Sequence, residues 1–139
     1  MTPVCEPVAP VPTWTHVRRF ALALPETDER VSRGLLQWRV KDRLFVWERP
    51  LRRADLAALG QRAPDGPIMG ARVEHLLAKE ALLADEGGVF FTTPHFDGYP
   101  AILVRLDQIA VDELEEVVVE AWLARAPKRL VDEYLHESP

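Results

Sequence analysis

The stretch LQWRVKDRLFVW, residues 36–47, decides the fold of this chain. Apolar residues occupy every second position from Leu36 to Val40, and this period of two is that of a half-buried β-strand. A polar break over residues 41–43 separates this run from a second apolar run, residues 44–47. Two strands around a short polar break predict an antiparallel hairpin, and a helix over these residues would contradict that prediction.

The length of the turn decides which side chains of this hairpin share a face. With a three-residue loop, Val40 pairs with Leu44, Trp38 faces the core, and Phe45 and Trp47 lie on the opposite face among basic residues. With a two-residue turn the pairing slips by one residue, so that Trp38 and Phe45 share a face. We favour the first register, which predicts a surface where cations alternate with aromatic rings.

Outward from the hairpin, hydrophobic spacing and the positions of glycine and proline predict the remaining elements. Helices are expected over residues 14–24, 52–59, 75–84 and 112–125 and after Pro127, and strands over residues 67–73, 89–91 and 101–106. This order lacks the strict strand–helix alternation of a parallel sheet. We predict one two-layer α+β domain over residues 13–139, an antiparallel sheet with helices packed on one face. A proline-rich N-terminal arm, residues 1–12, precedes it.

Composition limits the class of protein and its compartment. The chain has 139 residues, of which 47% are hydrophobic, enough for a core. No apolar run approaches the roughly 20 residues that span a bilayer, and the N-terminus lacks the basic flank and apolar core of an export signal. The single cysteine, Cys5, allows no internal disulfide. We therefore expect a cytoplasmic protein with no membrane partner.

Charge is distributed unevenly along the chain. The net charge is −5, which disfavours nonspecific binding to nucleic acid. Residues 30–62 nevertheless hold nine Lys or Arg against three acids, whereas residues 107–120 hold six acids and no Lys or Arg. A field of this kind can attract an anionic partner to one side of an acidic protein. Lys128 and Arg129 open the last helix, where the helix dipole makes cations slightly unfavourable. This hints at a partner, such as the acidic helix just before, and we favour an internal salt bridge.

The segment FFTTPHFDGYP, residues 90–100, is the most distinctive stretch of the chain. Asp97-Gly98 is a strong turn dipeptide, so we expect mainly a structural loop between two strands. His95 could instead act as a general base oriented by Asp97 or belong to a metal site, or the loop could bind a partner or a small ligand. The other histidines show no metal-ligand spacing, and the usual phosphate-loop, redox and hydrolase motifs are missing. We expect no metal, no cofactor and no catalysis.

The order of short motifs along the chain resembles the MmcQ/YjbR family. The motifs are QWRV (37–40), LF (44–45), KEALL (79–83), FFTTPHFDGYP (90–100), AW (121–122) and APKR (126–129). The resemblance implies a compact two-layer α+β fold, similar to that of frataxins and type III secretion chaperones. Members are often labelled DNA-binding, although no general activity is established for the family. The family residues singled out here are Thr92, Thr93, His95, Asp97, Gly98 and Tyr99 in the loop, and the basic pair Lys128 and Arg129.

Two functions from different classes fit these observations. The first is weak, non-catalytic DNA binding by the hairpin, because cations meet phosphates and aromatic rings meet bases. Its residues are Arg39, Lys41, Arg43, Phe45, Trp47, Arg49, Arg52 and Arg53. The alternative is a protein-interaction or self-association module, such as a homodimer, that uses the open sheet face and residues 92–100. Exposed rings at Phe45 and Trp47 would need cover on that interpretation.

Overall fold

The computed structural model describes residues 11–137, so residues 1–10 of the expected arm lie outside the described residues. The helices are α1 Trp14–Leu22, α2 Arg53–Leu59, α3 Leu76–Leu83, α4 Val111–Arg125 and α5 Lys128–Glu137, with short 3₁₀ helices η1 Gly60–Arg62 and η2 Pro94–Phe96. The strands are β1 Thr27–Ser32, β2 Leu35–Val40, β3 Arg43–Glu48, β4 Ile68–Arg72, β5 Phe90–Phe91 and β6 Ala101–Arg105. Within residues 11–137, no helix is long and apolar enough to cross a membrane.

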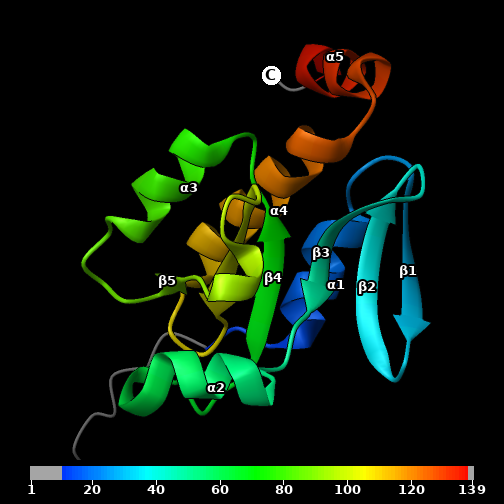
Figure 1. Ribbon diagram of the computed structural model, residues 1–139. Coiled ribbons are helices and arrows are strands. Elements are labelled where there is room, and N and C mark those ends of the chain that lie inside the picture. Colours follow the sequence, from blue (N-terminus) through cyan, green and yellow to red (C-terminus); the bar gives the residue numbers. More distant parts are fainter. Residues whose placement is uncertain (1–10, 138–139) are drawn as a thin grey trace, which may run out of the picture.

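The six strands form one antiparallel sheet in the order β1-β2-β3-β4-β6-β5 (Figure 1). The predicted α+β class and antiparallel sheet are confirmed, and residues 36–47 form the hairpin β2–β3. Strand β1 is absent from the sequence-based prediction. Val31 is its one apolar residue, and that side chain is 66% exposed, so the strand has no alternating hydrophobic signal.

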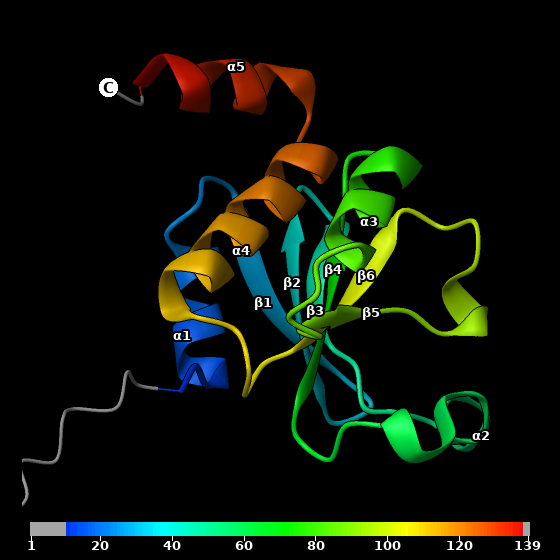
Figure 2. The ribbon, with the colours of Figure 1, turned by 90° about the vertical axis from the view of Figure 1, so that its left-hand side faces the viewer.

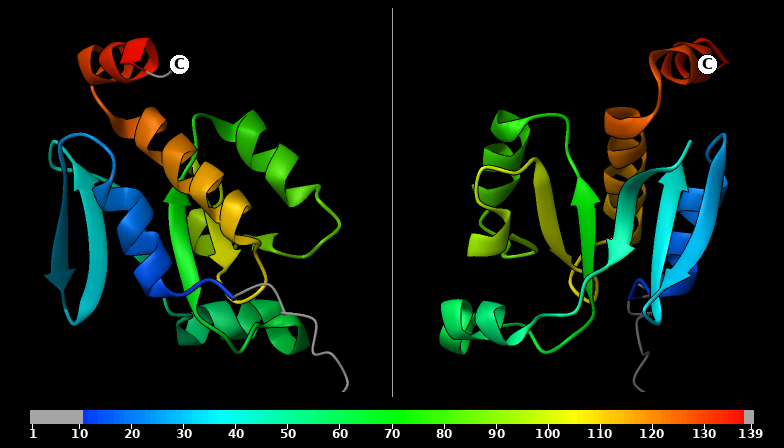
Figure 3. Two further views of the ribbon diagram at one scale, coloured as in Figure 1. Left: turned by 180° about the vertical axis from the view of Figure 1, so that it is seen from behind. Right: turned by 45° about the vertical axis from the view of Figure 1, so that its right-hand side comes forward.

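Helices α1 and α4 lie side by side against one face of the sheet (Figure 2; Figure 3). This face carries the main core, in which Trp38 of β2 and Trp122 of α4 are fully buried. The Trp14 ring of α1 stacks on Trp38, with 6.3 Å between the ring centroids. Both buried indole N–H groups find acceptors, in the Glu29 carboxylate for Trp38 and the Pro25 carbonyl for Trp122. Large aromatic side chains with satisfied donors therefore fix the helices on this face.

The opposite face of the sheet is covered only in part. Beside β4, β6 and β5, a second group of buried residues brings together Ile68, Phe96, Ala101 and Leu103. Phe96 belongs to η2, so residues 92–100 fold over these strands, and α2 contacts η2 from outside. Strands β1–β3 carry no helix on this face (Figure 1). The second face is thus divided into a covered part and an open part.

The hairpin turn contains two residues, not three. Lys41 and Asp42 both have positive φ angles, 46° and 70°, and Val40 pairs with Arg43. Positive φ at both central residues defines a type I′ turn, whose twist matches that of the two strands. The favoured three-residue loop, with Val40 opposite Leu44, is therefore wrong at the turn.

Beyond the turn, Trp38 pairs with Val46 as the favoured register requires, because Phe45 is inserted as a β-bulge before Val46. The bulge directs Phe45 into the main core, where it is 0% exposed. Trp47 packs on the second face with Phe96. The prediction of a surface ring at Phe45 is therefore wrong, whereas Trp47 does lie on that face.

Candidate functional site

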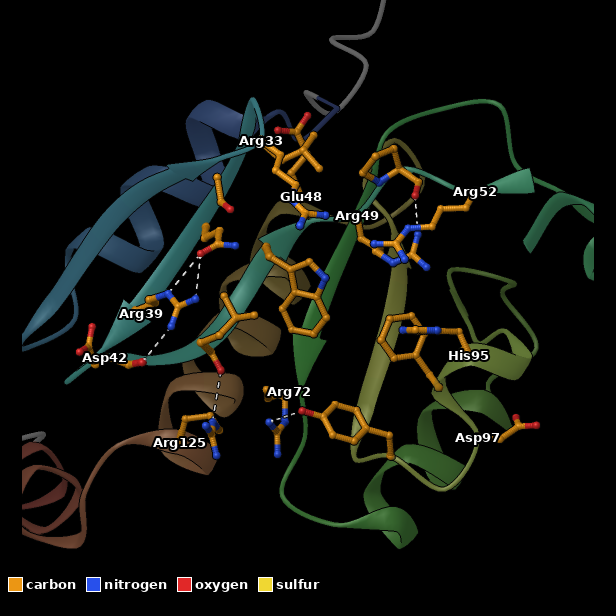
Figure 4. Close-up of a pocket in the computed structure, with 18 of the residues that line it drawn as sticks. Arg33, Arg39, Asp42, Glu48, Arg49, Arg52, Arg72, His95, Asp97 and Arg125 are labelled. Carbon is orange, nitrogen blue, oxygen red and sulfur yellow. Dashed lines mark hydrogen bonds between the residues drawn. The ribbon is translucent and has the colours of Figure 1, made fainter. Parts of the chain in front are cut away.

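The open part of the second face holds a groove of about 760 Å³, which we call the arginine groove (Figure 4). It is lined by residues of β2 and β3, by residues 95–99, and by Arg72 of β4 and Arg125 of α4. The basic hairpin and the distinctive loop are separate features in the sequence, and the fold brings them together at this one site.

The arginine groove carries positive charge in a protein of net charge −5. Its arginines are Arg33, Arg39, Arg49, Arg52, Arg72 and Arg125, and its acids are Asp42, Glu48 and Asp97. Six cations and three carboxylates leave a net charge of +3. Within residues 11–137, Arg49 is the only one of the six arginines with a carboxylate oxygen within 4.0 Å. The Asp42 carboxylate is paired with Arg30, which lies outside the groove.

The Trp47 indole lies on the sheet between the two parts of this face. A Cβ atom at Gly70, opposite Trp47 in β4, would lie 2.2 Å from Cε2 of the indole. Such a contact shows that the ring rests directly on the Gly70 backbone. The half-buried indole also lies near Phe96, with 6.4 Å between ring centroids, and it lines the groove. Glycine at position 70 therefore lets an aromatic ring lie on the groove floor.

Arg72 and Tyr99 form a bonded pair at one side of the groove. Arg72 donates from Nη1 to the Tyr99 hydroxyl at 2.9 Å and from Nε to the Pro100 carbonyl at 3.2 Å. Its guanidinium carbon also lies 4.7 Å from the centroid of the Tyr99 ring. The Tyr99 side chain is 44% exposed. These contacts hold both side chains in place while leaving Tyr99 open to a ligand.

Arg125 reaches the same side of the groove from the last turn of α4 (Figure 4). Its Nε donates to the Leu44 carbonyl at 3.2 Å, and its own carbonyl accepts from Nη1 of Arg43 at 3.1 Å. Burial, followed by the charge of Arg72, lowers the pKa of Arg125; Tyr99 opposes this, and the charge of Arg43 adds a smaller lowering effect. Arginine keeps its charge at neutral pH even so, and three cations therefore lie close together here.

A buried lysine holds the loop that forms one side of the groove. Residues 96–99 make a type II turn, in which Gly98 has φ +72° and the Tyr99 N–H donates to the Phe96 carbonyl at 3.0 Å. The predicted Asp97-Gly98 turn is confirmed. Lys79 of α3, which is 5% exposed, donates to the carbonyls of Phe96 and Tyr99 at 2.6 and 3.0 Å. Burial lowers the pKa of Lys79, and the charge of Asp97 partly opposes this.

A buried ion pair also anchors the loop. Arg49 and Asp55 are 5% and 3% exposed, and Nη2 of Arg49 lies 3.0 Å from the Asp55 carboxylate. Burial alone would raise the pKa of Asp55, but the Arg52 backbone N–H and the Arg49 charge outweigh it and leave that pKa below its ordinary value. The hydroxyl of Thr93, itself 1% exposed, makes no hydrogen bond within the described residues. The guanidinium carbon of Arg49 lies 5.3 Å from the centroid of the Phe96 ring, so this ion pair and Lys79 both contact the loop.

Four of the eight predicted hairpin residues line the arginine groove: Arg39, Trp47, Arg49 and Arg52. Arg39 is held along the sheet by Gln37 Oε1 and by the Asp42 carbonyl. Arg49 is committed to Asp55, so it is not a freely available phosphate contact. Arg39, Arg52 and Trp47 are therefore the predicted residues best placed to meet a ligand.

The other four hairpin residues do not line the groove. Phe45 is buried in the main core. Lys41 lies 3.6 Å from the Glu26 carboxylate, and Arg43 turns to the Arg125 carbonyl. Arg53 begins α2 and is exposed outside the groove.

The predicted loop residues divide between the groove and the loop interior. His95, Asp97, Gly98 and Tyr99 line the groove, whereas Thr93 is buried and Thr92 lies in a separate pocket with Phe91. His95 is exposed, with its ring edge on Phe96 and 4.9 Å between centroids. Asp97 points away from His95 (Figure 4), and the two side chains share no hydrogen bond. In the part of the chain that the structure describes, no three His, Cys, Asp or Glu side chains gather as a metal site would require.

The acidic residues at 107–120 lie away from the groove. Those at 112–120 belong to α4, which packs on the opposite face of the sheet, and none of residues 107–120 lines the groove. Lys128 and Arg129 are also outside it; Arg129 pairs with Glu133 at 3.1 Å within α5, as an internal salt bridge requires. The sheet therefore separates a basic surface from an acidic one.

Sequence reasoning missed three of the groove arginines: Arg33, Arg72 and Arg125. Arg72 and Arg125 stand alone in the sequence, near the end of a strand and of a helix, whereas Arg33 lies in the basic segment 30–62, between β1 and β2 and outside the hairpin. Arg72 and Arg125 are 53 positions apart, so only the tertiary fold brings them together. No local pattern could have identified them.

Comparisons with known proteins agree on the family and the fold. The model of the YjbR family matches residues 22–124. Uncharacterised proteins of Mycobacterium tuberculosis and Mycobacterium bovis are 52% identical over 129 residues, covering 91% of this chain and 98% of each relative. The crystal structure of a Deinococcus radiodurans protein with a DUF419 domain superposes with a TM-score of 0.61 at 16% identity, covering 84% of this chain and 80% of that one.

Proposed function

The chain belongs to the YjbR family, and we propose that it is a non-catalytic module that binds single-stranded nucleic acid in the arginine groove. One observation carries this proposal: arginines without carboxylate partners in the described residues line a groove that has the Trp47 indole on its floor. A partner that supplies both negative charges and flat rings matches this surface. Nucleic acid does so, and DNA is the natural first probe.

Each part of the groove has a counterpart in a nucleic-acid strand. Arg39 and Arg52 can neutralise backbone phosphates, and such contacts provide most sequence-independent affinity. The rings of Trp47 and Tyr99 can stack with bases, which is tolerant of sequence. We favour a single strand over a duplex because Trp47 is half-buried on the groove floor, where an unpaired base reaches it and a paired base does not.

The proposed binding is weak and depends on salt. Three or four simultaneous phosphate contacts are a realistic maximum for a groove of this size, and each contributes about −0.7 to the slope of log affinity against log salt on single strands. We therefore expect a slope of about −2 to −3 and micromolar affinity or weaker at physiological salt. The acidic surface on the far side of the sheet lowers long-range attraction without blocking the groove.

Fluorescence anisotropy with a labelled oligothymidine at two salt concentrations tests the proposal. The double variant Arg39→Ala/Arg52→Ala is expected to bind at least about tenfold more weakly, with a salt slope shallower by about 1.4. The matched control is Arg53→Ala/Arg129→Ala, which removes the same charge from exposed positions outside the groove. Absence of binding at low salt, or equal losses in both double variants, would refute the proposal.

The non-catalytic part of the proposal is supported by the arrangement of His95. This side chain is exposed and shares no hydrogen bond with Asp97, so nothing in the described residues orients it as a general base. Broad substrate profiling of the wild type beside His95→Ala is the test. Turnover that depends on His95 would make the chain an enzyme. The proposal also places the protein in the cytoplasm, where nucleic-acid strands are available.

The alternative of self-association through the open sheet face has lost its main support. It rested on two exposed rings, and Phe45 is fully buried while Trp47 is half-buried against Gly70. The groove also carries a net charge of +3, so two copies of this face would bring like charges together across an interface. A dimer detected by light scattering, and abolished by Arg39→Glu, would restore this alternative.

A further inference from the structure

We propose that Arg72, Arg125 and Tyr99 form a binding site for a phosphate monoester at one side of the arginine groove. The ligand would be the terminal phosphate of a strand or the phosphate of a free nucleotide. The proposal rests on the proposed function only in taking the rest of the groove as the place for the attached nucleotide. It adds a preference for ligands that carry a phosphate monoester, which a groove that binds only internal phosphodiesters would not show.

The hydrogen bonds of the two arginines leave their terminal nitrogens free. Arg125 uses Nε on the Leu44 carbonyl, and both of its Nη atoms have no acceptor within residues 11–137. Arg72 uses Nε and Nη1, so its Nη2 is the nitrogen left over. Backbone carbonyls thus orient both guanidinium groups without neutralising them. Two terminal N–H groups of one guanidinium match two oxygens of a phosphate.

The Tyr99 hydroxyl completes the set of donors. It accepts a hydrogen bond from Nη1 of Arg72 at 2.9 Å, so its own proton remains available for another acceptor. A phosphate beside Arg72 would receive that O–H in addition to the guanidinium donors. Arg125 then supplies two donors, Arg72 one and Tyr99 one, all to the oxygens of a single anion.

The charge around Arg72 and Arg125 favours a phosphate monoester over an internal phosphodiester. Arg43 adds a third cation through its contact with the Arg125 carbonyl, and none of the three has a carboxylate within 4.0 Å in the described part of the chain. The mutual repulsion of these groups contributes to the lowered pKa of Arg125. A phosphate monoester carries about −1.5 to −2 charges at neutral pH, whereas a phosphodiester carries one. The doubly charged group relieves more of the repulsion.

The position of Arg72 and Arg125 relative to Trp47 also suits a nucleotide. Arg72 lies two residues from Gly70 on the same face of β4, which is about 7 Å along a strand, and the Trp47 indole rests on Gly70. A phosphate on Arg72 and Arg125 would place the attached base close to that ring. Lys79 and the type II turn hold Tyr99 in place before any ligand arrives, which lowers the cost of ordering the site.

Isothermal titration with matched ligand pairs tests the proposal. The pairs are adenosine monophosphate against adenosine, and hexathymidylate with a 5′- or a 3′-phosphate against the same strand without a terminal phosphate; inorganic phosphate is the minimal probe. The phosphorylated member of at least one pair is expected to bind about tenfold more tightly, the effect of a few charge-assisted hydrogen bonds. Arg125→Gln should bring the ratio of the two affinities to one, and Tyr99→Phe should reduce that ratio about threefold. Arg129→Gln, outside the groove, is the control of equal charge.

The outcomes separate this proposal from the proposed function. Equal binding within every pair, the mononucleotide pair included, together with strand binding that Arg39→Ala/Arg52→Ala weakens, overturns the monoester site and leaves strand binding intact. Tight binding of the mononucleotide without measurable binding of either strand supports the site and overturns strand binding. Thermal unfolding checks each variant, and Arg72→Lys, which keeps the charge but loses the fork, replaces Arg125→Gln if that variant does not fold. An unchanged ratio in folded Arg72→Lys and in Tyr99→Phe overturns the site.

Discussion

The two parts of the second sheet face differ in what their outward residues are. Beside β4 and β6 they are Ile68, Ala101 and Leu103, and the 92–100 segment covers them with Phe96. Beside β2 and β3 they include Gln37 and Arg39, and this part stays open as the arginine groove. One sheet thus builds a small core and a charged site on the same face. The difference lies in side-chain polarity, and the loop that covers the first part forms a side of the second.

The comparison predicts its largest effect in the covered part. Phe96→Ala should lower the free energy of unfolding by about 4 kcal/mol, because the ring is 7% exposed and its removal leaves a cavity between the loop and the sheet. Arg33→Ala, at an exposed position lining the open part, should change it by less than about 0.5 kcal/mol. Urea unfolding measures both. Similar losses in the two variants would mean that the two parts do not differ as described.

The loop anchor gives the second prediction. Asp55→Asn should cost about 3 kcal/mol at pH 7, because it leaves Arg49 charged and buried without its partner. The pKa of Asp55 is lowered by folding, so its contribution to stability is present above the ordinary value of 3.8 and is lost as pH falls through the lower folded value. Between pH 7 and pH 3, the free energy of unfolding should therefore fall less in the variant than in the wild type, and unfolding curves at the two pH values measure this difference. An equal acid loss in both proteins would show that Asp55 is not the group that titrates.

The boundary between the two parts gives the third prediction. Gly70→Ala places a methyl group 2.2 Å from the Trp47 indole, so the ring must move and stability should fall by about 2 kcal/mol. The displaced ring should also weaken oligothymidine binding, because it no longer lies on the groove floor. In the background Trp47→Leu, the same glycine substitution should cost less, and a double-mutant cycle measures the difference. Additive effects would show that the ring and Gly70 are not in contact.

Much of the fold could be predicted because hydrophobic periodicity is local. The alternation around Trp38 and the helical spacing before Trp122 both identify core residues that are fully buried. Phe45 was misplaced because it and Val46 are both apolar, so the pattern cannot reveal which of two neighbours a bulge turns inward. Strand β1 carries no alternation at all, and its pairing with β2 places it in the sheet.

The site was predictable only in pieces. The hairpin pattern predicted Arg39 and Trp47 as site residues, and the distinctive loop predicted Tyr99. No sequence pattern indicated that the three line the same groove. Arg72 and Arg125 join them through strand pairing and helix packing, which act over long separations. Local patterns therefore identified site residues that lie in runs, and missed Arg72 and Arg125, which only the tertiary fold brings to the groove.

The smallest effect is expected at the turn of the hairpin, at the outer edge of the open part. Asp42 has φ +70°, a conformation in which glycine is not strained, so Asp42→Gly should raise the free energy of unfolding by about 0.5 to 1 kcal/mol. Its exposed ion pair with Arg30 is a minor loss, and the carbonyl that accepts from Arg39 is kept.

The same substitution at Asp65, an exposed residue outside the positive-φ set, is the matched control and should lower stability slightly, because glycine there only adds freedom to the unfolded chain. Urea unfolding of both variants measures the difference. A two-residue turn with the bulge at Phe45 requires that glycine raise the free energy of unfolding at position 42 and lower it at position 65. A three-residue loop at residues 41–43 carries no such requirement. Opposite signs, together with unchanged oligothymidine binding by Asp42→Gly, would establish that the turn sets the register while the groove depends on residues farther along the strands.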